Sequence, residues 1–198
     1  MNYEDIIIKT YQYVKEASAY NDMGHDYLHV LRVVSLAKKI GSNYKNCDMF
    51  LVEMSALLHD VEDDKLKSKK YYSVKDFLSS NGLDLEMINK IMHYISFVSY
   101  SKNNTKNDNI PLEAKIIQDA DRIDAIGAVG VARTFAFSAA NNIPFYDDSK
   151  NIHSTLDHFE EKLFKLYDLL NTKEAKEIAF KRHEFMKTYY NQFLDEIK

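Results

Sequence analysis

The chain has 198 residues and a mass of 23.1 kDa, with 45% apolar and 28% charged residues, which predicts one globular domain and excludes an intrinsically disordered protein. Its formal net charge of −4 removes the simplest argument for a nucleic-acid polymer as partner, because phosphate backbones are bound by concentrated Lys and Arg. Five Gly and two Pro are few for a protein with many tight turns, so long helices joined by few loops are expected.

Three features concern the cellular location. Cys47 is the only cysteine, so the chain has no internal disulfide, and a thiolate metal site is excluded as well. The first residues do not combine a basic stretch with an apolar core, and no run of about 18 apolar residues occurs. A cytoplasmic protein that neither crosses nor binds a membrane is therefore expected.

Apolar residues recur at helical spacing along nearly the whole chain. Asn81-Gly82 predicts a break between helices, and the polar stretch at 99–109 predicts a loop. Between them, apolar residues at helical spacing continue to Val98 and predict a further helix. Gly127 and Gly130 would allow the helix that contains them to pack closely. Helices are predicted over residues 24–40, about 47–60, 73–80, the stretch ending near 98, from about 112 past 123, around 127–130, and as two helices over about 152–197 that meet near 171–172.

The first candidate site residues lie in the predicted helix 24–40, which reads GHDYLHVLRV at its start. His25 and His29 are four residues apart and therefore share one helix face. Arg32 follows His29 by about one turn, on the same side.

A second candidate is the adjacent pair His59-Asp60, which ends the apolar helix containing Ala56-Leu57-Leu58. Two ionisable groups at the end of a buried helix are costly to desolvate, so they need a partner such as a metal cation. Neighbouring helical residues diverge by about 100°, but both can bind one ion that lies between them. A buried hydrogen-bonded cluster without metal is the alternative.

A third candidate is the acidic run QDADRID at residues 118–124, which places carboxylates on an otherwise apolar helix. Imidazoles and carboxylates from three helices would leave positions for water on a six-coordinate ion. A nitrogen and oxygen ligand set without thiolates suits Mn²⁺, Fe²⁺, Co²⁺ or Mg²⁺ better than structural zinc. A divalent ion is therefore expected as cofactor, with Mn²⁺ as the first choice.

These three segments, HDYLHVLRV, LLHDV and DADRIDAIG, resemble in order and separation the signature blocks of the HD superfamily of metal-dependent phosphohydrolases, especially its compact bacterial branch. The family pattern of one His, an adjacent His-Asp pair and a distant Asp implies His29, His59, Asp60 and Asp121 as metal ligands. The resemblance covers about residues 24–135. It implies an all-α fold, a single HD-domain helical bundle over residues 1–198, with the C-terminal helices at about 152–197 packed on the motif-bearing core.

The resemblance also implies a reaction, hydrolysis of a phosphate ester or anhydride by metal-activated water. In HD enzymes that hydrolyse guanosine tetraphosphate, an acidic pair follows His-Asp after two residues, and Asp63-Asp64 has that position here. Either residue is a candidate general base, and Asp64 could instead hold a second ion. The family's pair begins with Glu, so the match at this position is partial.

Several side chains are candidates for contact with the substrate. Arg32, Lys65 and Arg122 could meet a phosphate, and His25 could donate a hydrogen bond beside the metal. His93 lies on a largely apolar predicted helix and could face the same cleft. Three have a structural alternative: a helix-terminal hydrogen bond for His25, a solvated loop position for Lys65 and a structural role for His93.

The first functional hypothesis is a hydrolase of a small phosphorylated molecule, a nucleoside triphosphate that releases pyrophosphate. An alarmone hydrolase or a nucleotide monophosphatase is the enzymatic alternative. A metal-binding nucleotide sensor with little turnover is an alternative of another class. The sequence leaves the oligomeric state open.

Overall fold

The computed structural model describes residues 3–18, 26–61, 73–100, 103–105, 109–149 and 151–197. In these ranges every regular element is a helix, which confirms the predicted all-α fold. The α-helices are α1 (Tyr3–Ser18), α2 (Tyr27–Gly41), α3 (Met49–Leu58), α4 (Val74–Ser80), α5 (Leu85–Ser96), α6 (Leu112–Asp124), α7 (Gly127–Ala140), α8 (Thr155–Glu161) and α9 (Lys173–Glu196), and a 3₁₀ turn, η1, spans Leu163–Leu166.

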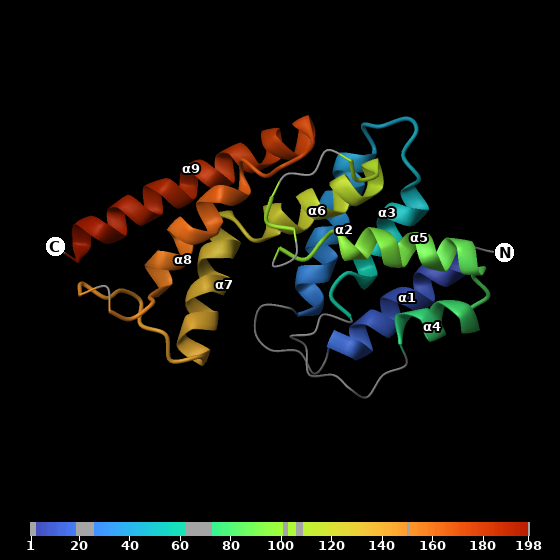
Figure 1. Cartoon of the computed structure of the whole chain (residues 1–198), viewed down its shortest axis with the longest axis horizontal. Helices are drawn as coiled ribbons and strands as arrows, with labels where there is room; N and C mark the ends of the chain where they lie inside the picture. Colours follow the sequence, from blue (N-terminus) through green and yellow to red (C-terminus); the bar gives the residue numbers. More distant parts are fainter. Residues whose placement is uncertain are drawn as a thin grey trace.

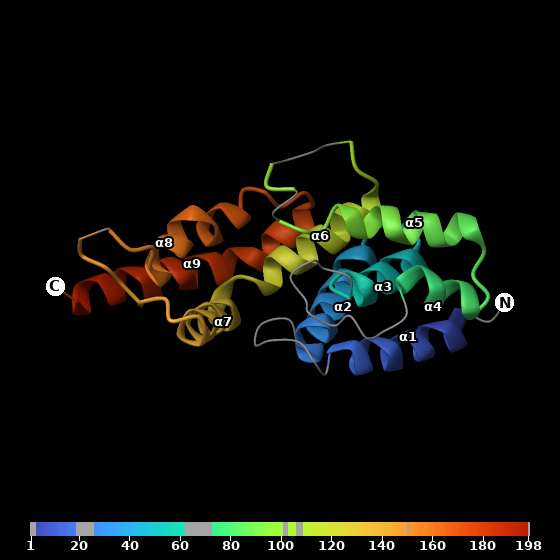
Figure 2. The ribbon, with the colours of Figure 1, turned by 60° about the horizontal axis from the view of Figure 1, so that its bottom comes forward.

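Helix α6 lies in the middle of the molecule. Helices α1 to α5 lie on the side of the N-terminus, while α7, α8 and α9 lie toward the C-terminus (Figure 1). The view in Figure 2, turned by 60°, keeps the two termini at opposite ends. Helix α2 packs on both α3 and α6, and α9 packs on α6 and α7. The buried apolar side chains of α2, α3 and α6 form the part of the core that carries the candidate site.

Local sequence explains where these helices begin. Six helices begin after a capping residue whose side chain accepts a hydrogen bond from a backbone N–H of the first turn, which satisfies donors that have no partner within the helix. These residues are Asp26, Asp48, Ser73, Asp84, Ser154 and Thr172. Helix α2 therefore begins at Tyr27, after its Asp26 cap, and not at Gly24 as predicted.

Two parts of the fold differ from the predicted elements. Helix α1 was not predicted from the sequence, although Ile6, Val14 and Ala17 are buried along one side of it. In the C-terminal region the first predicted helix is broken into α8 and η1, whereas the second begins at Lys173, directly after the predicted junction. None of the described helices alone is long and apolar enough to cross a membrane. Helices α6 and α7 reach that length and apolar content only together, as a pair bent by 68°.

Candidate metal centre

His29 comes from the first turn of α2. Its backbone N–H donates to Oδ1 of the capping Asp26 at 2.7 Å, and its side chain shares the inward face of α2 with Val33, Ala37 and Ile40. The ring is buried. The helix thus turns one imidazole into the core next to α3 and α6.

His59 and Asp60 directly follow the last residue of α3, as the sequence predicts. Nδ1 of His59 lies 2.8 Å from the carbonyl oxygen of Ala56. A carbonyl only accepts, so Nδ1 donates to it, and in the neutral ring Nε2 presents its lone pair. This Nε2 atom is buried and has no hydrogen-bond partner among the described residues, which is the state required of a metal ligand.

Asp121 of α6 closes the cluster. Its Oδ1 atom lies 3.5 Å from Nε2 of His29 and 3.8 Å from Nε2 of His59. Ligand atoms of His29, His59 and Asp121 all lie within 4.8 Å of one another, and the two oxygens of Asp60 lie 3.3 Å from Nε2 of His29 and 3.4 Å from Nε2 of His59. The residues and their spacing fit a single divalent cation bound by nitrogen and oxygen.

Asp124 lies on the opposite side of the His29 ring. Its Oδ2 atom is 2.7 Å from Nδ1 of His29, and its carboxylate also accepts from Arg32 at 2.7 and 3.1 Å and from Arg133 at 2.8 Å. Burial alone would raise the pKa of Asp124, but His29 and Arg32 outweigh it and hold this pKa well below its usual range. An ionised Asp124 orients His29 with Nε2 toward the cluster.

The cluster is strongly anionic around His29. Burial disfavours the charged imidazole, but hydrogen bonds to Asp124 and Asp60 and the charges of Asp121 and Asp60 prevail and raise the pKa of His29 to about 9. A bound cation would take over from the proton in balancing these carboxylates.

Two predicted substrate contacts already have protein partners. Arg32 pairs with Asp124. Arg122 is buried and donates to the carbonyl oxygens of Leu169 and Asn103 at 2.5 and 2.8 Å. Its guanidinium thus joins α6 to two connecting segments.

His93 and the remaining predicted residues are placed as follows. His93 lies exposed on α5, with its ring edge-on to Phe97 at 4.8 Å, and it is outside the group of ligand atoms formed by His29, His59 and Asp121. His25, Asp63, Asp64 and Lys65 lie outside the described residues.

Arg133 was missed in the sequence. Its Nη1 atom lies 3.1 Å from Nδ1 of His29 as well as 2.8 Å from Asp124. The signal that could have found it is its isolation, because Arg133 is the only charged residue in α7.

Asp119, two residues before Asp121, has a structural role and does not belong to the cluster of candidate ligands. Its carboxylate is fully buried and accepts from the backbone N–H groups of Asn171 and Thr172, both at 2.8 Å, and from their side chains at 2.9 and 2.8 Å. Thr172 caps α9. The first carboxylate of the acidic run therefore anchors the start of α9.

The chain is similar in sequence to known proteins over the segments that carry the candidate metal centre. The model of the HD domain family matches residues 26–126, a range that contains all four predicted metal ligands. The YpgQ protein of Bacillus subtilis (strain 168) is 39% identical over 178 residues, which are 88% of this chain and 85% of that protein.

Solved structures agree with this match over nearly the whole length. The crystal structure of Bacillus subtilis YpgQ in complex with ADP has a TM-score of 0.82 and 37% identity, covering 99% of this chain and 97% of that one. The crystal structure of an HD-superfamily hydrolase from Bacillus thuringiensis has a TM-score of 0.77 and 36% identity, covering 98% of both chains.

Proposed function

Because this chain belongs to the HD domain family of metal-dependent phosphohydrolases, we propose that it hydrolyses a nucleoside triphosphate and releases pyrophosphate. The observation that carries the proposal is the convergence of two buried imidazoles and the Asp121 carboxylate from three segments. The ADP complex of the Bacillus subtilis relative supports a nucleotide as the ligand class.

We propose His29, His59, Asp60 and Asp121 as the ligands of one divalent ion, with Mn²⁺ as the first choice. Such an ion lowers the pKa of a bound water molecule and offsets negative charge on phosphate oxygens. The protein's own part is to hold the two imidazoles in their ligating orientation, through the Ala56 carbonyl for His59 and through Asp124 for His29.

Other roles remain proposals of the same kind. Asp63 or Asp64 is the candidate general base, and His25, Lys65 and His93 are candidate substrate contacts. Arg32 and Arg122 already have partners within the protein, so a supporting role is proposed for them in place of direct phosphate binding. A cytoplasmic location and a single structural unit are proposed from composition and length.

The test is hydrolysis of a nucleotide panel with Mn²⁺, Co²⁺, Mg²⁺ or no added metal, followed by product identification. Pyrophosphate among the products would support the proposed reaction, and orthophosphate would point to the monophosphatase alternative. His59→Ala and Asp121→Asn should abolish metal binding and turnover, while Asp148→Asn, at an exposed position in the α7–α8 connection, should change neither. Full turnover by His59→Ala would refute the centre.

A further inference from the structure

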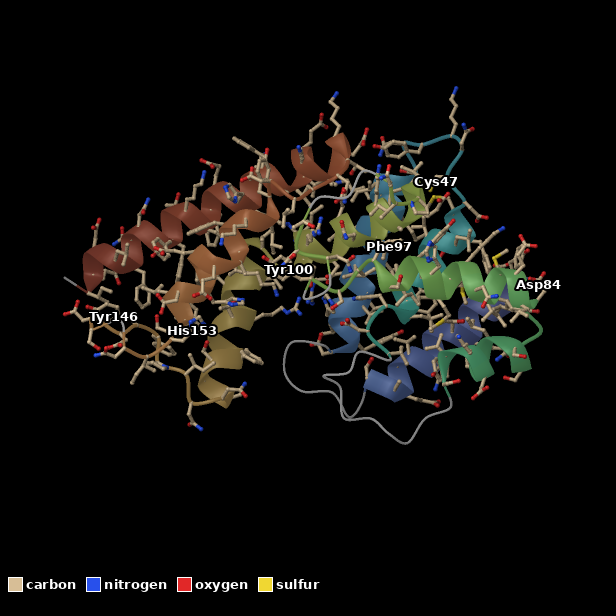
Figure 3. All side chains as sticks on the ribbon, in the orientation of Figure 1. Cys47, Asp84, Phe97, Tyr100, Tyr146 and His153 are labelled. Atoms are coloured by element: carbon tan, nitrogen blue, oxygen red, sulfur yellow. The ribbon has the colours of Figure 1, made fainter. Side chains whose placement is uncertain are left out.

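A cavity of about 390 Å³ lies between α7, the turn at Ile143 and the segment from Ser154 to Leu163. We call it the α7–α8 cavity. Thr134, Phe137 and Ser138 of α7 line one wall, and His158 and Lys162 line the facing wall. In Figure 3, His153 and Tyr146 mark the connection from α7 to α8, and Tyr100 lies on the side toward α6. This volume is sufficient for part of a small molecule.

The α7–α8 cavity adjoins the candidate metal centre. Ala125, one of its wall residues, lies one helical turn after Asp121, and its N–H donates to the Asp121 carbonyl at 3.1 Å. One turn advances the chain by about 5.4 Å. Arg133, which also lines the cavity, reaches Nδ1 of His29 at 3.1 Å. The cavity therefore lies one turn of α6 from Asp121 and shares Arg133 with the pair of His29 and Asp124.

The walls combine apolar surface with a few polar groups. Phe137 exposes 53% of its surface, and Ile143 and Leu163 add aliphatic carbon. An exposed phenyl ring suits stacking with a flat ring. The structural alternative is a gap in the packing of α7 on α8 that binds nothing. It does not explain why polar side chains such as Thr134, His158 and Lys162 line the same cavity.

The polar groups differ in charge. Burial and the nearby charge of Lys162 lower the pKa of His158 to about 4, so this imidazole is neutral at pH 7 and can exchange hydrogen bonds with an uncharged partner. Lys162, whose Nζ atom lies 5.0 Å from the centre of the Tyr100 ring, supplies positive charge, whereas Arg133 is paired with Asp124. Neutral recognition and phosphate attraction are thus present in one cavity.

We propose that the α7–α8 cavity holds the nucleoside part of the substrate, with the phosphates directed along α6, from Ala125 toward Asp121 of the metal centre. This inference rests on the proposed function, since it assigns the subsite for the part of a nucleotide that does not react. Phe137 and Thr134 are then specificity-determining residues.

The experiment compares two probes, ADP and inorganic pyrophosphate, each titrated calorimetrically into the full-length protein with Mn²⁺. Pyrophosphate lacks the nucleoside, so only the binding of ADP should depend on the side chains that line the cavity. Thr134→Leu adds volume within the cavity, and Phe137→Ala removes the exposed ring. Ala139→Leu makes a similar addition at an exposed position of the same helix, outside the cavity, and serves as the matched control.

We expect Thr134→Leu and Phe137→Ala each to weaken ADP binding by about tenfold, the loss that corresponds to a stacking or packing contact, with pyrophosphate and Mn²⁺ binding unchanged. Ala139→Leu should bind both probes like the wild type. Unchanged ADP binding in both cavity variants, or equal loss of ADP and pyrophosphate, would overturn the proposal.

Two further measurements distinguish failure of this inference from misfolding of a variant and from failure of the proposed function. Thermal unfolding identifies a variant that is misfolded, and if Thr134→Leu is, Phe137→Ala decides by the same criterion because its side chain is half exposed. Failure of the proposed function would show as absence of turnover on every nucleotide, whereas failure of this inference would show in ADP binding alone.

Discussion

Nδ1 of His29 lies 2.7 Å from Oδ2 of Asp124, and this carboxylate, with no exposed side-chain surface, also receives Arg32 and Arg133. The pair links a candidate metal ligand to two cationic side chains from different helices. Its contribution can be measured separately from that of the ligands, because Asp124 is on the far side of the ring.

Asp124→Asn should weaken Mn²⁺ binding by about 10- to 100-fold, the range for loss of a carboxylate that orients a ligating histidine. The neutral amide no longer balances Arg32 and Arg133, and its NH₂ group faces their donors. Calorimetric titration with Mn²⁺ checks this, with Asp148→Asn as the matched control. Affinity equal to that of the wild type would show that Asp124 does not orient His29.

Asp119→Asn should lower the free energy of unfolding by about 3 kcal/mol, because one carboxylate oxygen becomes an NH₂ group, so the buried N–H of either Asn171 or Thr172 loses its acceptor and faces another donor. Chemical denaturation in the presence of a chelator measures the change. Asp121→Asn, on the same helix and with 27% of its side chain exposed, should cost much less. Equal losses in the two variants would contradict the anchoring role of Asp119.

His158 should make the protein less stable in mild acid. Burial and the charge of Lys162 lower the folded-state pKa from 6.5 to about 4, so as the pH falls below about 6.5 the unfolded chain takes up a proton that the folded protein does not. The loss of stability grows until about pH 4 and is absent above pH 7. His158→Gln should therefore show a smaller fall in melting temperature between pH 7 and pH 5 than the wild type; identical falls would argue against the shift.

Gly130→Ala should destabilise the junction of α6 and α7. A Cβ atom at this position would lie 2.2 Å from the carbonyl oxygen of Ala125, which is backbone and moves only with the junction, so a loss of about 3 kcal/mol is expected. Gly82→Ala is the comparison, because its φ of +87° is strained for alanine but nothing lies within 4 Å; about 1 kcal/mol is expected there. Urea denaturation would rank the two, and a smaller loss at Gly130 would contradict the clash.

Helices α2, α3 and α6 could be predicted because their signals are local, and the ligand set could be predicted from the resemblance of three segments to the HD superfamily. Apolar spacing marks α2, α3 and α6, and the adjacent His59-Asp60 stands out at the end of an apolar segment. The structure brings His29, His59 and Asp121 together, although the sequence placed them on separate helices with no information on distance. Their assignment as metal ligands stays a prediction until metal binding is measured.

Other features depend on contacts between distant segments. Arg133 is 104 residues from His29, and its role becomes visible only when the fold brings its side chain beside the His29 ring. The two carboxylates Asp119 and Asp121 look alike in the sequence, but neighbours from 52 and 53 residues away make the first a structural anchor. Arg122 looked suited to phosphate, yet its partners are two backbone carbonyls.

The anchoring of Asp119 bears on how the chain could be shortened. A fragment that ends at residue 126, where the match to the HD family ends, would keep His29, His59, Asp60 and Asp121. It would lack Arg133, which supports Asp124, and the amides of Asn171 and Thr172, which satisfy Asp119. Such a fragment would carry every candidate ligand but lack the partners of two buried carboxylates of α6, so the C-terminal third is an integral support of the family core.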